Sequence, residues 1–136
     1  MFQTNKRIWG PIGKPVGKYF ALPSNMGKIV GFFGRSGRYL DSIGAYVELY
    51  SSKLYPFKSV GLFGGSGGLS WDDGKHANVR KIVIVLEPMV EPVIESITFQ
   101  YAEYGKELWL SERHGSPSEG DAHTVSSESS YLNAIM

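Results

Sequence analysis

Short runs in which apolar and polar residues alternate recur along this chain, and almost no stretch has the residue spacing of a helix. In residues 41–50, every second residue from Ile43 to Leu49 is apolar, and residues 94–105 repeat the pattern. A period of two residues is typical of strands with one buried face. Residues 79–88 are apolar on both faces in the middle of the run, which predicts a strand covered on both sides.

Turn-forming residues separate these runs. Glycine accounts for 17 of the 136 residues, above its usual share of about 7%, and it clusters with proline in residues 9–27. Residues 28–34 form another predicted strand, and residues 106–112 are the predicted hairpin partner of residues 94–101. Strands at this spacing without intervening helices predict an all-β barrel, sandwich or prism.

Two segments lack clear alternation. Residues 49–61 contain two adjacent serines, a proline and two lysines, and we interpret them as a connection between two β units. The tail, residues 115–136, is rich in serine. We predict a loop there with one strand near residues 121–132, and a disordered C-terminus is the alternative.

The overall composition excludes several classes of function. A length of 136 residues predicts one domain that buries most of its apolar surface. The 14 basic and 13 acidic residues give a net charge of +1, which predicts no electrostatic binding of nucleic acid or of an anionic membrane. The chain has no cysteine, which excludes disulfides, thiolate catalysis and cysteine-based zinc sites.

Two further features concern location. Residues 1–10 lack the apolar segment of a signal peptide. No uninterrupted apolar run approaches the roughly 18 residues of a membrane helix. Together with the absence of cysteine, these features lead us to expect a cytoplasmic or nucleocytoplasmic protein without membrane insertion.

Residues 63–74, FGGSGGLSWDDG, contain two candidate sites. Four glycines around Ser66 let the backbone approach a ligand closely, although the sequence of a phosphate-binding loop is absent and a flexible turn is the alternative. The paired aspartates that follow lack the spaced ligands of a calcium loop. We therefore predict that Asp73 and Gly74 form a turn with Trp71 packed beneath it.

No pattern in the chain predicts catalysis. His76, His114 and His123 are scattered and have no metal-binding spacing, so we expect exposed loop histidines. The GxSxG sequence of a serine hydrolase is absent. These observations predict a protein that is not an enzyme and that needs no cofactor and no metal.

Asp41 follows a loop rich in glycine and arginine, residues 34–40. A carboxylate only accepts hydrogen bonds, whereas the neighbouring glycines offer backbone N–H donors. Donors around one charged acceptor are what a neutral polyol needs. From spacing alone, the alternative of a helix cap or an Asx turn ranks first.

Several stretches together resemble the jacalin-related lectin domain of plants. Residues 27–47, GKIVGFFGRSGRYLDSIGAYV, resemble the last two strands of that domain. Residues 63–74, 79–85 and 93–115 resemble its first strands, and residues 4–23 match a middle-to-late segment. The resemblance implies an all-β fold, a β-prism I of three Greek-key sheets with four strands each.

The order of these stretches differs from that of the family. Residues 1–50 correspond to the C-terminal half of the family domain and residues 61–136 to its N-terminal half, with residues 51–60 as the joining segment. A circularly permuted single domain, residues 1–136, explains this order because the first and last strands of the family share a sheet. A segment cut across two tandem repeats is the alternative.

The family order also implies material between Met136 and Met1 that this sequence lacks, equivalent to about one or two strands. One Greek key would then be incomplete or completed by a neighbouring chain. The third loop of the family's sugar site falls in this part.

The resemblance implies a monosaccharide site made of two loops. In the G-x-x-x-D loop, the backbone N–H groups of Arg38 and Tyr39 and the carboxylate of Asp41 would bind ring hydroxyls, and a glycine of the second loop would add a backbone N–H. The residues carried over are Gly37, Arg38, Tyr39, Leu40, Asp41 and Gly68. Galactose-preferring members carry a free amino terminus at that glycine, whereas here Gly67 precedes Gly68.

We therefore expect a non-catalytic lectin of the mannose/glucose type that binds mannose- or glucose-containing glycans. Weak single-site affinity predicts a homo-oligomer or a tandem array. The alternative is a structural or protein-interaction module that keeps the fold without binding sugar.

Overall fold

The computed structural model describes residues 1–12, 18–22, 25–54, 56–88, 93–105, 107–117, 120–126 and 132–135. Within these residues the chain forms twelve strands in three antiparallel sheets and no helix, so none of the described part could cross a membrane as a helix. The all-β prediction is confirmed.

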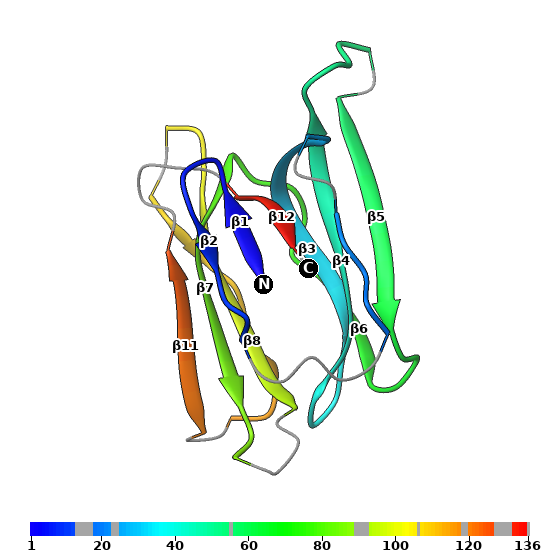
Figure 1. Ribbon diagram of the computed structural model, residues 1–136, viewed down its shortest axis with the longest axis vertical. Coiled ribbons are helices and arrows are strands. Elements are labelled where there is room, and N and C mark those ends of the chain that lie inside the picture. The colour runs from blue at the N-terminus through cyan, green and yellow to red at the C-terminus, as the bar shows by residue number, and fades with distance from the viewer. Residues whose placement is uncertain are drawn as a thin grey trace.

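Two sheets contain the long strands and stand on opposite sides of the molecule in Figure 1. One has the order β5-β4-β3-β6, with β3 (Gly27–Ser36), β4 (Leu40–Leu49), β5 (Phe57–Gly64) and β6 (Leu69–Asp72). The other has the order β10-β8-β7-β11 and adds β9 to β8; its strands are β7 (Asn78–Leu86), β8 (Ile94–Ala102), β9 (Trp109–Leu110), β10 (His114–Gly115) and β11 (Asp121–Ser126).

The third sheet is short, and only part of it is seen between the long sheets in Figure 1. Its order is β12-β1-β2, with β1 (Phe2–Thr4), β2 (Ile8–Trp9) and β12 (Leu132–Ile135). The described sheets therefore hold four, five and three strands, where four each were expected.

Apolar side chains from all three sheets meet in one core. Phe32 of β3 and Phe99 of β8 are both fully buried, and their rings stack with centroids 4.3 Å apart. Leu132 of β12 and Phe2 of β1 complete the core on the third side. Each large aromatic or aliphatic side chain buried in this way contributes about 1.5–3 kcal/mol.

The alternating runs form strands where they were expected. Residues 28–34 lie inside β3, residues 41–50 correspond to β4 and residues 94–101 lie inside β8. The expected partner of β8 in residues 106–112 is reduced to β9, in which Leu110 pairs with Gln100.

Two strand expectations need correction. In β7, Ile82, Ile84 and Leu86 are buried, but Val83 and Val85 on the other face are only half-buried, so the strand is not fully covered on both sides. The sequence there contains apolar residues on both faces because valine suits a pleated strand whether or not it is buried.

The joining segment is shorter than expected, because β5 begins at Phe57, inside residues 51–60. β5 pairs with β4 from Glu48↔Phe57 to Ser42↔Gly64. The strand was missed because most of its residues are exposed, which removes the alternation that a buried face imposes.

Strands far apart in the sequence pair directly. β6 pairs with β3, from Phe33↔Asp72 to Ser36↔Leu69. β1 pairs with β12, with Phe2 opposite Ile135, so the two ends of the described chain lie side by side (Figure 1). The first of these pairings brings the loop after β5 next to the turn after β3.

Candidate functional site

The two predicted loops lie against each other at one end of the sheet β5-β4-β3-β6. Because Ser36 pairs with Leu69, Gly68 lies directly beside Gly37. Gly68 has a φ of +66°, and a Cβ atom placed on it would overlap the carbonyl of Ser36. Glycine is therefore required here for both conformation and space.

Asp41 lies across from the same loop and is partly exposed. A Cβ atom on Gly67 would come within 2.8 Å of Oδ1 of Asp41, so the missing side chain is what lets the backbone approach the carboxylate. The N–H of Gly65 donates to the carbonyl of Asp41 at 2.8 Å. The glycine-rich loop and Asp41 are thus fixed relative to each other by the backbone.

Arg35 joins the two loops, and sequence reasoning missed it. Its Nε donates to the carbonyl of Gly67 at 3.1 Å and its Nη2 to the carbonyl of Gly68 at 2.7 Å. A planar guanidinium suits two adjacent acceptors of this kind. Only the arginines flanking Ser36 in GRSGR hinted at this role, because the contact spans more than 30 residues of sequence.

The second long sheet supports the turn between β3 and β4. Arg38 Nη2 lies 3.5 Å from Glu87 Oε1, and the N–H of Ser116 donates to the carbonyl of Arg38 at 3.1 Å. A hydrogen bond from Tyr39 to Glu87 raises the pKa of the Tyr39 hydroxyl. The side chains of Arg38 and Tyr39 are thus held at the end of β7.

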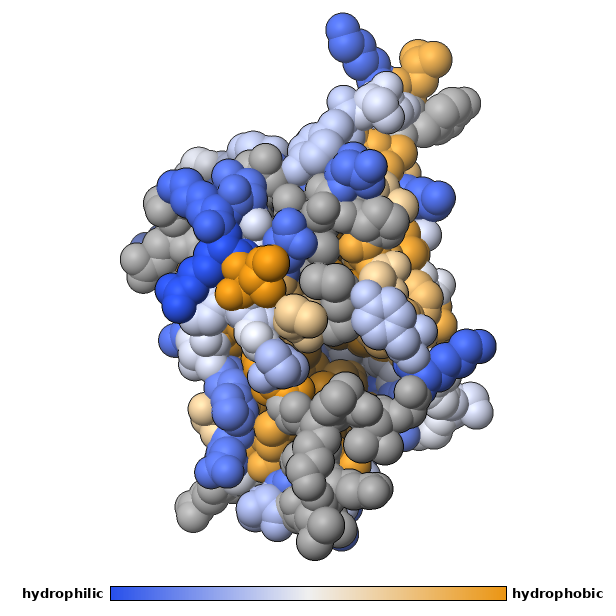
Figure 2. Space-filling view, viewed as in Figure 1, coloured by the Kyte–Doolittle hydropathy of each residue, from blue (hydrophilic) through white to orange (hydrophobic). Residues whose placement is uncertain are grey.

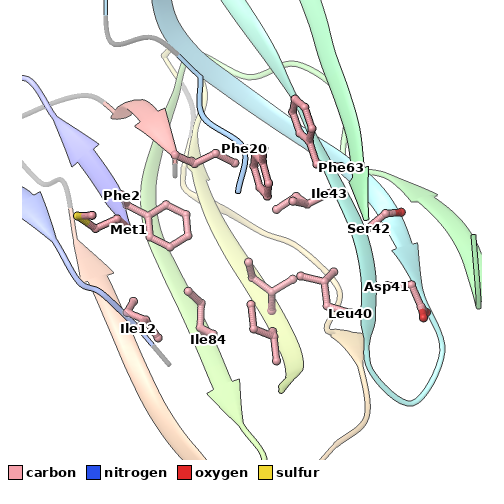
Figure 3. Close-up of a pocket in the computed structure, with 13 residues that line it drawn as sticks. Met1, Phe2, Ile12, Phe20, Leu40, Asp41, Ser42, Ile43, Phe63 and Ile84 are labelled. Carbon is pink, nitrogen blue, oxygen red and sulfur yellow. The ribbon is translucent and has the colours of Figure 1, made fainter. Parts of the chain in front are cut away.

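The side chain of Leu40 points away from the two loops. Figure 3 shows it directed into an apolar cavity, whereas the carboxylate of Asp41 points away from that cavity. The other predicted site residues lie on or directly beside the two converging loops. They are Gly37, Arg38, Tyr39, Asp41 and Gly68.

A second polar cluster lies buried beneath the WDDG segment. The side chain of Asp73 is 4% exposed and accepts hydrogen bonds from the Tyr101 hydroxyl and from His114 Nε2, both at 2.8 Å. The ring of His114 stacks on Trp71, with centroids 3.6 Å apart. Burial and the Asp73 carboxylate raise the pKa of Tyr101 above its usual range.

The expectation of exposed histidines is wrong for two of the three. The side chains of His76 and His114 are 9% and 7% exposed, and only His123 is exposed on its strand. His76 pairs with Glu103, and its Nε2 contacts the carbonyl of Asp73 at 2.6 Å. Buried imidazoles need polar partners, and these carboxylates and carbonyls provide them.

The turn at the end of WDDG has the expected conformation. Gly74 has a φ of +74°, and its N–H donates to Asp72 Oδ1 at 2.8 Å. The Tyr46 hydroxyl donates to Asp72 Oδ2 at 2.6 Å, and partial burial followed by this bond raises the pKa of Tyr46 to about 12. The described residues contain no group of three or more side chains that could hold a metal ion.

Comparison with known proteins points to one family. Residues 1–46 and 60–135 match the family model described as Jacalin-like lectin domain. An agglutinin of Castanea crenata is 38% identical over 122 residues, which cover 84% of this chain and 38% of that protein.

Two relatives from Arabidopsis thaliana are named for the proteins they bind. Myrosinase-binding protein 2 is 38% identical over 115 residues, which cover 84% of this chain and 17% of that protein. PYK10-binding protein 1 is 33% identical over 116 residues, which cover 84% of this chain and 38% of that protein. This chain therefore spans less than two fifths of the length of each of these relatives.

Proposed function

Because this chain belongs to the Jacalin-like lectin family, a family of carbohydrate-binding proteins, we propose that it binds mannose- or glucose-type sugars reversibly at the two converging loops. The observation that carries this proposal is the approach of Gly67 to the carboxylate of Asp41. It puts one charged acceptor next to a loop rich in backbone donors, on a partly exposed surface.

Each polar group in this site has a chemical role toward a sugar. The Asp41 carboxylate accepts hydrogen bonds from two ring hydroxyls, and the N–H groups of Arg38, Tyr39 and Gly68 donate to hydroxyl oxygens. The carbonyls of Arg38 and Tyr39 already accept hydrogen bonds from Ser116 and Gly37, both at 3.1 Å. The turn therefore offers its donors to a ligand in preference to its acceptors.

The preference for mannose or glucose rests on the unbroken chain at the second loop. Gly67 precedes Gly68 and contacts Asp41, so no free amino group lies at this glycine. In the family, a free amino terminus at the equivalent glycine accompanies a preference for galactose. The unbroken chain at Gly68 therefore supports a preference for mannose or glucose.

The site is small, and we expect weak binding by one copy. Hydrogen bonds to a charged group contribute roughly 1.5–3 kcal/mol each. A dissociation constant of millimolar order corresponds to about 4 kcal/mol, the equivalent of two such bonds. Useful binding to glycans then requires several linked sites, in a homo-oligomer or a tandem array.

β5 supports self-association. It forms one edge of its sheet, and Phe57 and Leu62 on it are 44% and 48% exposed. An edge strand with exposed apolar side chains readily pairs with another strand. Light scattering with and without mannose measures the number of copies directly.

Substitution of Asp41 tests the site. Asp41→Ala should abolish retention on mannose resin while leaving the circular dichroism spectrum unchanged, because the side chain is partly exposed. Asp121→Ala is the matched control, since Asp121 is an exposed aspartate on β11. Retention of the Asp41→Ala protein at the level of the control would contradict the assignment.

We also propose that the chain is a circularly permuted single domain. The pairing of β4 with β5 across residues 50–56, and of β3 with β6, supports this reading. A single unit should unfold in one transition, at the same urea concentration in a variant that keeps only Trp9 and in a variant that keeps only Trp71 of the three tryptophans. Two separate transitions, each reported by one tryptophan, would contradict it.

A protein-binding module is the second candidate function. The names of two relatives and the short third sheet favour it. The folded protein would then give no signal on a glycan array that includes mannosides and glucosides.

A further inference from the structure

Glu87 directly follows β7 and contacts the turn between β3 and β4 from the second long sheet. The end of β7 and this turn both lie at the lower end of the view in Figure 1. The side chain of Glu87 is 19% exposed and that of Arg38 is 69% exposed, with Arg38 Nη2 at 3.5 Å from Glu87 Oε1. The Tyr39 hydroxyl also donates to the Glu87 carboxylate. One half-buried carboxylate therefore contacts the side chains of both turn residues whose amides are proposed to bind the sugar.

Apolar side chains fill the core between the two long sheets. Apolar residues also show at the surface between these sheets in Figure 2. Apolar packing has no preferred direction, so it does not by itself orient the peptide groups of an exposed turn. Hydrogen bonds do have a preferred direction, and the polar contacts of Glu87 are therefore suited to orient the turn.

Backbone hydrogen bonds hold the turn on two sides, but one of them is shared. The N–H of Gly37 donates to the carbonyl of Tyr39 at 3.1 Å. The N–H of Ser116 is divided between the carbonyl of Arg38 at 3.1 Å and the carbonyl of Glu95 at 3.2 Å. A divided N–H holds each acceptor less firmly than an undivided one. The side-chain contacts with Glu87 therefore add a restraint that the backbone alone does not provide.

The second oxygen of the Glu87 carboxylate shows that stability is not the reason for an acid at this position. Oε2 is buried and has no hydrogen-bond partner within the described residues. A buried acceptor without a partner lowers the stability of a protein. Stability alone would therefore favour an apolar side chain here, and what the carboxylate adds is its contact with Arg38 and Tyr39.

We propose that Glu87 is a positioning residue of the sugar site. It holds the side chains of Arg38 and Tyr39 so that the backbone N–H groups of the same two residues face the sugar. A turn without this restraint would have to become ordered on binding, and that ordering lowers affinity. Glu87 thus increases the affinity for sugar without touching it. This inference rests on the proposed function, since it concerns the same site.

Substitution of Glu87 in two backgrounds tests this role by isothermal titration calorimetry. In the otherwise unaltered chain, Glu87→Ala should weaken the binding of methyl α-mannoside about three- to fivefold, the size expected for a partly exposed ion pair. The Arg38→Ala/Tyr39→Phe protein keeps both backbone amides but lacks both side-chain partners. In that background, Glu87→Ala should change the affinity by less than about 1.5-fold. Glu107→Ala is the control, since Glu107 is an exposed glutamate between β8 and β9.

Nitrogen-15 relaxation of the ligand-free protein gives a second measurement that needs no sugar. The amides of residues 38 and 39 should have lower order parameters in Glu87→Ala than in the unaltered protein and in Glu107→Ala. If Glu87→Ala does not fold, the Arg38→Ala/Tyr39→Phe protein breaks the same contacts from the other side and should show the same decrease.

An equal loss of affinity in both backgrounds, or unchanged order parameters at residues 38 and 39, would overturn the proposal. An unaltered protein that binds no mannoside would contradict the proposed function instead. The order parameters would then still decide whether Glu87 holds the turn.

Discussion

Asp41, at the start of β4, and Asp73, directly after β6, both belong to the sheet β5-β4-β3-β6, yet their surroundings are opposite. The side chain of Asp73 is 4% exposed and accepts hydrogen bonds from Tyr101 and His114. Asp41 is partly exposed and lies against the backbone of Gly67. A carboxylate surrounded by the protein's own donors stabilises the fold, whereas one beside an open glycine loop is available to a ligand.

Removal of each aspartate should separate these roles most strongly. Asp73→Ala leaves Tyr101 and His114 buried without their partner, and the free energy of unfolding should fall by about 3–5 kcal/mol. Asp41→Ala should lower it by less than about 0.5 kcal/mol. Urea denaturation followed by fluorescence measures both. Similar losses for the two variants would remove the distinction.

A substitution in the glycine loop should have the next largest effect on stability. In the Gly68→Ala protein, the alanine would have to adopt a φ near +66°, and its Cβ atom would overlap the Ser36 carbonyl. We therefore expect the free energy of unfolding to fall by about 1–3 kcal/mol and retention on mannose resin to be lost.

Gly105→Ala is its control. Gly105 has a φ of +65°, but an added Cβ would meet nothing within 4 Å. It should cost about 1 kcal/mol and leave mannose retention intact. Equal effects of the two substitutions on retention would show that the contact with Ser36 is irrelevant to the site.

The buried cluster should also make stability fall in alkali. Burial raises the pKa of Tyr101, and partial burial raises that of Tyr46 to about 12, above the value near 10 of an unfolded tyrosine. The unfolded chain therefore loses protons first as the pH rises above about 10, and the stability present below that pH is progressively lost. For Tyr101 alone the slope approaches 1.4 kcal/mol per pH unit.

Tyr101→Phe removes the group responsible for most of this slope. Its urea midpoint should be lower than that of the unaltered protein at pH 8 but should change less between pH 9 and pH 11. An unchanged alkaline slope in Tyr101→Phe would contradict the role given to this hydroxyl.

Arg35 should show the smallest effect. It bonds to the carbonyls of Gly67 and Gly68 from a partly exposed position, so Arg35→Ala should weaken mannose binding about five- to tenfold and change stability by less than about 1 kcal/mol. Arg35→Lys keeps the charge but not the planar fork and should behave like Arg35→Ala. Isothermal titration calorimetry compares the three proteins, and full affinity in Arg35→Lys would show that charge alone suffices.

Local patterns predicted the features that depend on neighbouring residues. β3 and β4 followed from alternation, because one face of each is buried. The two glycine loops were identified from their resemblance to a family, and Gly68 and Asp41 were chosen in that way.

Features that depend on distant residues were not predictable from the same patterns. The burial of His114 depends on Trp71 and Asp73, about 40 residues away. Arg35 acquires its role only when β3 pairs with β6. β5 carries no alternation because it is an exposed edge.

The most direct test of the sugar site is the backbone amide spectrum of the labelled protein during titration with methyl α-mannoside. We expect saturable shifts at Gly68, Arg38 and Tyr39, the amides proposed to donate to the sugar, with no shift at Gly105. The Asp41→Ala protein should keep the same spectrum and lose these shifts. Shifts centred elsewhere, or unchanged shifts in Asp41→Ala, would contradict the claim that the two loops form the binding site.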